Sequence, residues 1–113
     1  GENVSSFEVE AMVNAHPDVL QCAAIGVPSE FGEDEIKICV IARPAAALEP
    51  AALLEELATR MPRFMVPRFV EFVTELPRTE ATLRVQKVKL RERPFNERTW
   101  DRQAGRYLEP GNT

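Results

Sequence analysis

The fold of this chain is decided by two apolar segments, Val19-Leu-Gln-Cys-Ala-Ala-Ile-Gly-Val27 and Glu35-Ile-Lys-Ile-Cys-Val-Ile-Ala42. The first is apolar and partly β-branched, and it ends in the turn residues Gly26 and Pro28. The second alternates, so that one face carries Ile36, Ile38 and Val40 and the other carries Cys39 and Ile41. These patterns predict two strands, paired antiparallel across the polar loop Pro28-Ser-Glu-Phe-Gly-Glu-Asp34.

Helices are predicted before and after this strand pair. Ser5 and Glu8 have the spacing of a capping box, which predicts a helix from Ser6 to Ala15. A second helix is predicted to begin near Pro50 and to end at Pro62. Its apolar face would carry Leu53, Leu54, Leu57 and Met61.

The rest of the chain adds a third strand and a short helix. Alternation predicts a strand over Arg68–Leu76, followed by a loop over Pro77–Arg84 and a basic helix over Val85–Arg93. From Pro94 on we expect a polar tail, held in place, if at all, by Phe95, Trp100 and Tyr107. The order of elements predicts an α+β domain, residues 1–93, with a small, mostly antiparallel three-stranded sheet flanked by helices, and a tail of residues 94–113.

Length and charge limit the classes of protein that fit. The 113 residues allow one small domain, and a net charge of −4 gives no general reason to expect binding to nucleic acid or acidic lipid. The charge is divided, however, because residues 1–59 carry a net −9 and residues 60–113 a net +5. Any chemistry on anions therefore belongs to the second half.

Three features bear on where the protein works and whether it is whole. No apolar run approaches the roughly 18 residues of a membrane span, and we expect a cytoplasmic protein. Cys22 and Cys39 each lie in an apolar strand-like run, which favours buried free thiols over a disulfide. The chain begins at Gly1 and not at Met, so we expect it to be processed or cut from a longer protein.

Few residues can support hydrolytic, metal or phosphate-loop chemistry. His16 is the only histidine, and its place at the end of the first helix favours a surface imidazole over a catalytic one. The consecutive acids 33–35 are typical of a solvated loop, and we expect no metal there. The five glycines lack the spacing of a phosphate loop. The stretch Pro77–Arg91, with cations at 78, 84, 87, 89 and 91, is either a solvated basic face or a phosphate-handling segment.

Four segments point to a known family. They are Gly1-Glu-Asn-Val-Ser-Ser-Phe-Glu-Val-Glu10 with Ala15-His-Pro17, Ile25-Gly-Val-Pro-Ser-Glu-Phe-Gly-Glu-Asp-Glu-Ile-Lys37, Met65-Val-Pro-Arg-Phe-Val-Glu-Phe-Val-Thr-Glu-Leu-Pro-Arg-Thr79, and Val85-Gln-Lys-Val-Lys-Leu-Arg-Glu92. In this order they resemble the C-terminal subdomain of the adenylate-forming enzymes, the acyl-CoA and aryl-CoA synthetases with their luciferase and peptide-synthetase relatives. The opening segment and Thr99-Trp-Asp-Arg102 look most like the branch of fatty-acyl-CoA and crotonobetaine/carnitine-CoA ligases.

The resemblance implies a two-step reaction. A carboxylate and MgATP give an acyl-adenylate and pyrophosphate, and the thiol of CoA then displaces AMP. ATP with Mg²⁺, CoA and the carboxylic acid would be bound mainly by a large N-terminal adenylation domain that this chain lacks. The C-terminal subdomain would act as a lid that presents one face for adenylation and another for thioester formation. We expect the chain alone to be inactive.

The resemblance also assigns residues to the CoA side of the lid. These are Gly1, Glu2 and Asn3 beside the pantetheine tunnel, Phe31 against the CoA nucleotide, and Phe64 and Arg68 near its adenine and phosphates. Ordinary partial burial is an equal alternative for the two phenylalanines, and for Arg68 a solvated surface position is favoured over contact with CoA.

For adenylation, this chain departs from the family pattern. The family has Thr-Gly-Lys just before Val-Gln-Lys, and its lysine neutralises charge on the carboxylate and α-phosphate. Here the residues are Thr82-Leu-Arg84, with one extra residue after Thr79, so that Arg84 stands at the lysine position. Three outcomes stay open: Arg84 serves instead, Lys87 reaches in, or the first step is impaired. We favour the first.

Two readings from other classes compete with the ligase. A degenerate lid could act as a binding module without chemistry. A nucleic-acid binder would explain the basic second half, but aromatic residues are not interleaved with the bases and the whole chain is acidic. A preceding domain with an ATP loop rich in serine, threonine and glycine would decide for the ligase.

Overall fold

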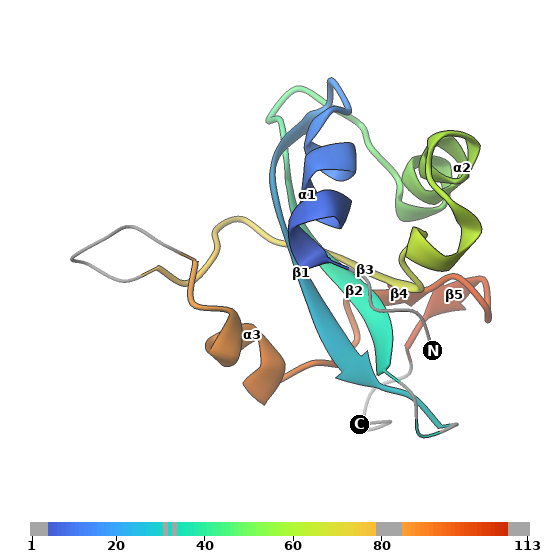
Figure 1. The fold of residues 1–113 in the computed structure, drawn as a ribbon. Coiled ribbons are helices and arrows are strands. Elements are labelled where there is room, and N and C mark those ends of the chain that lie inside the picture. The colour runs from blue at the N-terminus through green and yellow to red at the C-terminus, as the bar shows by residue number, and fades with distance from the viewer. Residues whose placement is uncertain (1–4, 31, 33, 79–84, 109–113) are drawn as a thin grey trace.

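A computed structural model describes residues 5–30, 32, 34–78 and 85–108 of the chain. Its elements are α1 (Ser6–Asn14), β1 (Val19–Pro28), β2 (Asp34–Ala42), α2 (Pro50–Arg60), the 3-10 helix η1 (Arg63–Met65), β3 (Phe69–Phe72), α3 (Lys87–Glu92), β4 (Thr99–Asp101) and β5 (Arg106–Tyr107). Figure 1 shows how they are arranged, with a twisted sheet between helices. The predicted α+β class is confirmed.

Within the described residues the sheet has the strand order β1-β2-β3-β4-β5. β1 and β2 pair antiparallel as predicted, with Val27 opposite Glu35 and Cys22 opposite Val40. β2 and β3 pair parallel, and the pairs β3-β4 and β4-β5 are antiparallel. The sheet is therefore mostly antiparallel, and β1 lies at one edge.

The expected three strands become five in the part of the chain that the structure describes. β3 ends at Phe72 rather than Leu76, and two further strands come from the segment expected to be a tail. Their aromatic residues hold them, since the Trp100 and Tyr107 rings meet edge to face at 5.1 Å. Strands of three and two residues are too short to show an alternation of their own, and they form because β3 offers them an open edge.

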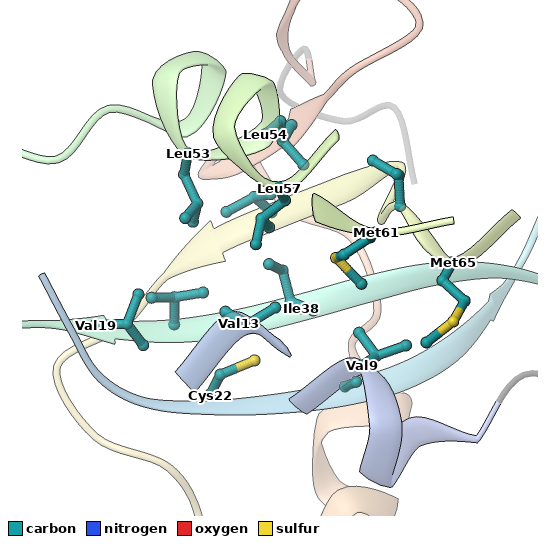
Figure 2. Close-up of a cluster of buried hydrophobic side chains, with 14 residues drawn as sticks. Val9, Val13, Val19, Cys22, Ile38, Leu53, Leu54, Leu57, Met61 and Met65 are labelled. Atoms are coloured by element: carbon teal, nitrogen blue, oxygen red, sulfur yellow. The ribbon is translucent and has the colours of Figure 1, made fainter. Parts of the chain in front are cut away.

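The larger core lies between the sheet and the two long helices (Figure 2). α1 contributes Val9 and Val13, and Ile38, Val40 and Val70 of the sheet belong to the same cluster; each of the five is at most 1% exposed. The predicted face of α2 is buried there too, with Leu53, Leu54, Leu57 and Met61. Ser5 precedes α1 as predicted, but its side chain makes no capping hydrogen bond. Among the described residues, no helix is both long and apolar enough to cross a bilayer.

The opposite face of the sheet carries smaller apolar clusters that pack against α3 and the segment after it. One cluster centres on Ala23, Cys39 and Leu76, and the other on Ile25, Val27 and Phe69. Leu90 of α3 packs against both clusters. α3 is thereby fixed to the face of the sheet that α1 and α2 do not cover, as Figure 1 shows.

The prediction of a surface imidazole at His16 is wrong. The residue is 6% exposed, and its Nε2 lies 2.6 Å from a carboxylate oxygen of Glu56 in α2. Its Nδ1 accepts a hydrogen bond of 3.0 Å from the backbone N–H of Asp18, so Nε2 is the nitrogen that donates to Glu56. The partner is 40 residues away in the chain, which is why no local pattern reveals it.

Both cysteines lie in the described part of the chain and are free, as predicted. Cys22 faces α1 and Cys39 faces the opposite side of the sheet, so their side chains point apart. Burial raises the pKa of both thiols, that of Cys39 to about 11. At neutral pH they are therefore protonated and poor nucleophiles.

These thiols make stability depend on alkaline pH. Above the ordinary pKa of 9.0 the unfolded chain releases the Cys39 proton while the folded chain keeps it, so stability falls as pH rises from about 9 to about 11. Urea unfolding of the parent chain should lose about 1.4 kcal/mol per pH unit over this range relative to Cys39→Ala. Parallel pH dependences of the two proteins would contradict this assignment.

Candidate functional site

The basic stretch Pro77–Arg91 lies where the chain turns back onto the sheet. Arg78 and Val85 form an isolated antiparallel bridge, and the N–H of Gln86 donates to the carbonyl of Pro77 at 2.7 Å. The two ends of the segment 79–84 are therefore held together. Arg84, the predicted adenylation cation, lies outside the described residues, immediately before Val85.

Lys87, the alternative cation, is the first residue of α3. Its Nζ lies 2.6 Å from Glu10 Oε2 and donates to Ser6 Oγ at 3.1 Å. The same carboxylate oxygen of Glu10 accepts a hydrogen bond of 2.8 Å from the N–H of Ala24. The ammonium of Lys87 thus binds α1 and does not stand free.

The structure describes only part of the predicted CoA side. Gly1, Glu2, Asn3 and Phe31 lie outside the described residues. Phe64 belongs to η1, and its side chain is 52% exposed. The ring is open to contact with another molecule, and its contact with CoA stays a prediction.

The surface alternative for Arg68 is wrong, because the residue is only 6% exposed. Its guanidinium makes two hydrogen bonds to Asp101, of 3.1 and 3.2 Å, and two to Glu30, of 3.1 and 3.3 Å. The carboxylate of Glu35 lies 3.8 Å away, and the Phe69 ring lies 4.8 Å below the guanidinium carbon. The guanidinium donors are therefore already matched by carboxylates.

This arrangement joins three parts of the chain. Arg68 precedes β3, Asp101 ends β4, and Glu30 lies in the connection between β1 and β2. Hydrogen bonds from Arg68 lower the pKa of Glu30, and those to Asp101 raise the pKa of Arg68. The partners are 38 and 33 residues from the arginine, so the sequence alone did not indicate them.

A second buried cation was missed by the sequence analysis. Lys37 is 1% exposed, and its Nζ lies 2.8 Å from Glu71 Oε1 and 2.5 Å from the carbonyl of Pro94. The signal was a lysine within an otherwise apolar strand, because a charge there requires a partner. Lys37 of β2 thereby contacts both β3, through Glu71, and Pro94, which lies just after α3.

The positively charged side chains in the second half of the chain thus fall into two groups, paired and exposed. Arg68 and Lys87 pair with acids of the first half, whereas Lys89 and Arg91 of α3 are exposed. The described site consists of a short basic helix, anchored at both ends, that begins three residues after Arg84, the predicted adenylation cation. Such an arrangement can hold a cation at a defined place beside a separate body that binds an anion.

Comparison with known proteins assigns this architecture to a family. The family model described as the AMP-binding enzyme C-terminal domain matches residues 8–82. The chain belongs to this family of C-terminal domains of adenylate-forming enzymes, which confirms the resemblance.

The relatives include CoA ligases. The chain is 38% identical over 94 residues to 2-methylpropanoate–CoA ligase of Humulus lupulus, covering 81% of this chain and 17% of the relative. It is 37% identical over 78 residues to crotonobetaine/carnitine–CoA ligase of Proteus mirabilis, covering 69% and 15%. ATP-bound MatB from Rhodopseudomonas palustris superposes with a TM-score of 0.74 at 35% identity, covering 81% and 18%. The chain therefore spans about a sixth of the length of these relatives.

The Arg68 cluster yields a test of stability. Arg68→Met leaves the Asp101 carboxylate, which is 7% exposed, without its charged partner, and should lower the free energy of unfolding by about 3–5 kcal/mol. The double variant Arg68→Met/Asp101→Asn should recover part of this loss, because no buried charge is left unpaired. In NMR titrations, the pKa of Glu30 should rise in Arg68→Met. Equal losses in the single and double variants would show that the buried charge is not the cause.

Proposed function

We propose that this chain is the mobile C-terminal lid of an ATP-dependent acid–CoA ligase. The reaction converts a carboxylate, ATP and CoA into acyl-CoA, AMP and pyrophosphate by way of an acyl-adenylate. The observation that carries the proposal is the family match over residues 8–82, together with relatives that are themselves CoA ligases. The lid contributes a cation to adenylation and one wall of the CoA site.

The partner of the lid is its own N-terminal adenylation domain. In this proposal that domain binds the carboxylic acid, most of ATP and most of CoA, and it holds Mg²⁺ against the phosphates of ATP. Among the described residues, no three histidine, cysteine or acidic side chains gather as metal ligands. The residues proposed for this chain are one cation for adenylation and a group of residues on the CoA side.

Arg84 is the cation proposed for adenylation. A guanidinium keeps the positive charge that the family lysine supplies, but it is a wide planar fork rather than a compact ammonium. The pairing of Arg78 with Val85 supports this choice, because it fixes the chain directly after Arg84. Lys87 is the weaker candidate, since its ammonium lies against Glu10.

Substitution of Arg84 tests this role in the enzyme formed with the adenylation domain. Arg84→Ala should lower ATP–pyrophosphate exchange on the order of 100-fold, because one charge that stabilises the transition state is lost. Arg84→Lys should retain most of the rate. Arg91→Ala removes an exposed arginine of α3 and is the matched control. If exchange in Arg84→Ala equals that of the parent enzyme, the assignment is wrong.

The CoA side is proposed to include Gly1, Glu2, Asn3, Phe31 and Phe64. Phe64 is 52% exposed, and an exposed ring can stack on the adenine of CoA. The guanidinium of Arg68 is already bound to the carboxylates of Glu30 and Asp101. Its proposed role is therefore indirect: it holds Glu30, the residue directly before Phe31.

Phe64→Ala should raise the KM for CoA about tenfold, as expected for the loss of one stacked ring, and leave pyrophosphate exchange unchanged. Steady-state thioester formation measures the first quantity. Phe7→Ala, which truncates another exposed ring, is the control and should change neither. An unchanged KM for CoA would remove Phe64 from the site.

A second candidate function is that of a degenerate lid that binds a partner without chemistry. The observation that favours it is Thr82-Leu-Arg84, in which both the glycine and the lysine of the family pattern are replaced. The two functions differ in one measurement, since the degenerate lid predicts no pyrophosphate exchange in the full enzyme.

A further inference from the structure

The free edge of β1 is covered by side chains from both layers of the fold. Within the described residues β1 pairs with β2 on one side and with no strand on the other, so alternate N–H groups along it point away from the sheet. Glu10 of α1 accepts the N–H of Ala24 at 2.8 Å and so satisfies one of these groups. This bond fixes α1 to the strand edge by a carboxylate.

Lys87 reaches the same carboxylate from the other side of the sheet. α1 covers one face and α3 the other (Figure 1). The Lys87 ammonium lies 2.6 Å from Glu10 and 3.1 Å from the hydroxyl of Ser6, so the pair spans the edge of β1. We call Ser6, Glu10, Ala24 and Lys87 the β1 clasp. The side chains of Glu10 and Lys87 are 19% and 26% exposed, so water screens the pair only in part.

The position of Lys87 is not explained by helix formation. It is the first residue of α3, where the unpaired N–H groups of the first turn repel a positive charge. Glu10 offsets this repulsion with a negative charge from another element. A lysine at this place therefore serves the contact with α1 rather than the helix itself.

The clasp also attaches the chain on one side of the segment 79–84. Arg78, on the other side, donates a side-chain hydrogen bond to Gln21 of β1. Arg78 is thus bound to β1 and Lys87 to α1 beside the edge of β1, and Lys87 is three residues from Arg84. The point at which the chain leaves and rejoins the sheet is defined by side chains of described residues.

We propose that Glu10 and Lys87 are positioning residues for adenylation, an inference that rests on the proposed function. They touch no reactant. By fixing Lys87 against α1 at the edge of β1, they fix the point in the chain that lies three residues after Arg84. A displacement of about 1 Å in a reacting group lowers the rate on the order of 100-fold. The contact between Lys87 and Glu10, three residues from Arg84, can therefore change the rate of adenylation.

The experiment compares the two half-reactions in the enzyme formed with the adenylation domain. Lys87→Met keeps the length of the side chain, and Glu10→Gln keeps an acceptor for Ala24 while removing the charge. Each should lower ATP–pyrophosphate exchange 10- to 100-fold, and Lys87→Arg should restore most of it. Thioester formation from preformed acyl-adenylate and CoA should stay within twofold of the parent enzyme.

Matched controls are Lys89→Met on α3 and Glu8→Gln on α1, both exposed, which should leave both half-reactions unchanged. Equal loss of both half-reactions together with a lower melting temperature would make the clasp merely structural and overturn the proposal. If pyrophosphate exchange is lost in Lys87→Met but not in Glu10→Gln, Lys87 is itself a catalytic cation, and the proposal of a positioning role is overturned.

The outcomes separate this inference from the proposed function. Exchange that is present in the parent enzyme and unaltered in Lys87→Met overturns the inference alone. Absence of exchange in the parent enzyme overturns the proposed function, and the inference with it.

Discussion

The contact on which much of the fold depends is the ion pair of Lys37 with Glu71, completed by the carbonyl of Pro94. A charge inside a sheet costs several kcal/mol unless it is paired and hydrogen-bonded. The chain must therefore place β3 directly beside β2, and must return after α3 to the same point. Pro94, just after α3, is bound to Lys37, and Leu90 of α3 packs against the sheet. The basic helix α3 is therefore fixed on the face opposite α1 and α2.

The division of charge along the chain has two physical meanings. Part of it is internal, since Arg68 and Lys87 of the basic half bind Glu30 and Glu10 of the acidic half. The pairs join elements that are far apart in sequence. The remaining cations of α3, Lys89 and Arg91, are exposed and pair with no acid named here. A net charge of +5 over residues 60–113 therefore overstates the charge available for binding.

Under the proposed function, the two catalytic steps use segments at the borders of a rigid body. The cation proposed for adenylation, Arg84, precedes Lys87 of the β1 clasp by three residues in the sequence, and the aromatic residues proposed for CoA belong to η1 and to the segment between β1 and β2. Loops on a packed scaffold suit this task, because a lid must present different groups while its core stays unchanged. Each border has its own charged anchor, Glu10 for one and Arg68 for the other.

The sequence by itself determined the helices α1 and α2, the pair β1-β2 and the family, because periodicity and motifs are local or stand in a fixed order. It also marked residues 77–91 as the informative stretch. Tertiary structure alone decided the strands β4 and β5, the burial of His16 and Lys37, and the partners of Arg68 and Lys87. Those partners lie between 33 and 81 residues away, and only packing can choose among the many carboxylates of the chain. Burial then makes the choice strict, because a charge excluded from water requires a partner at a definite place.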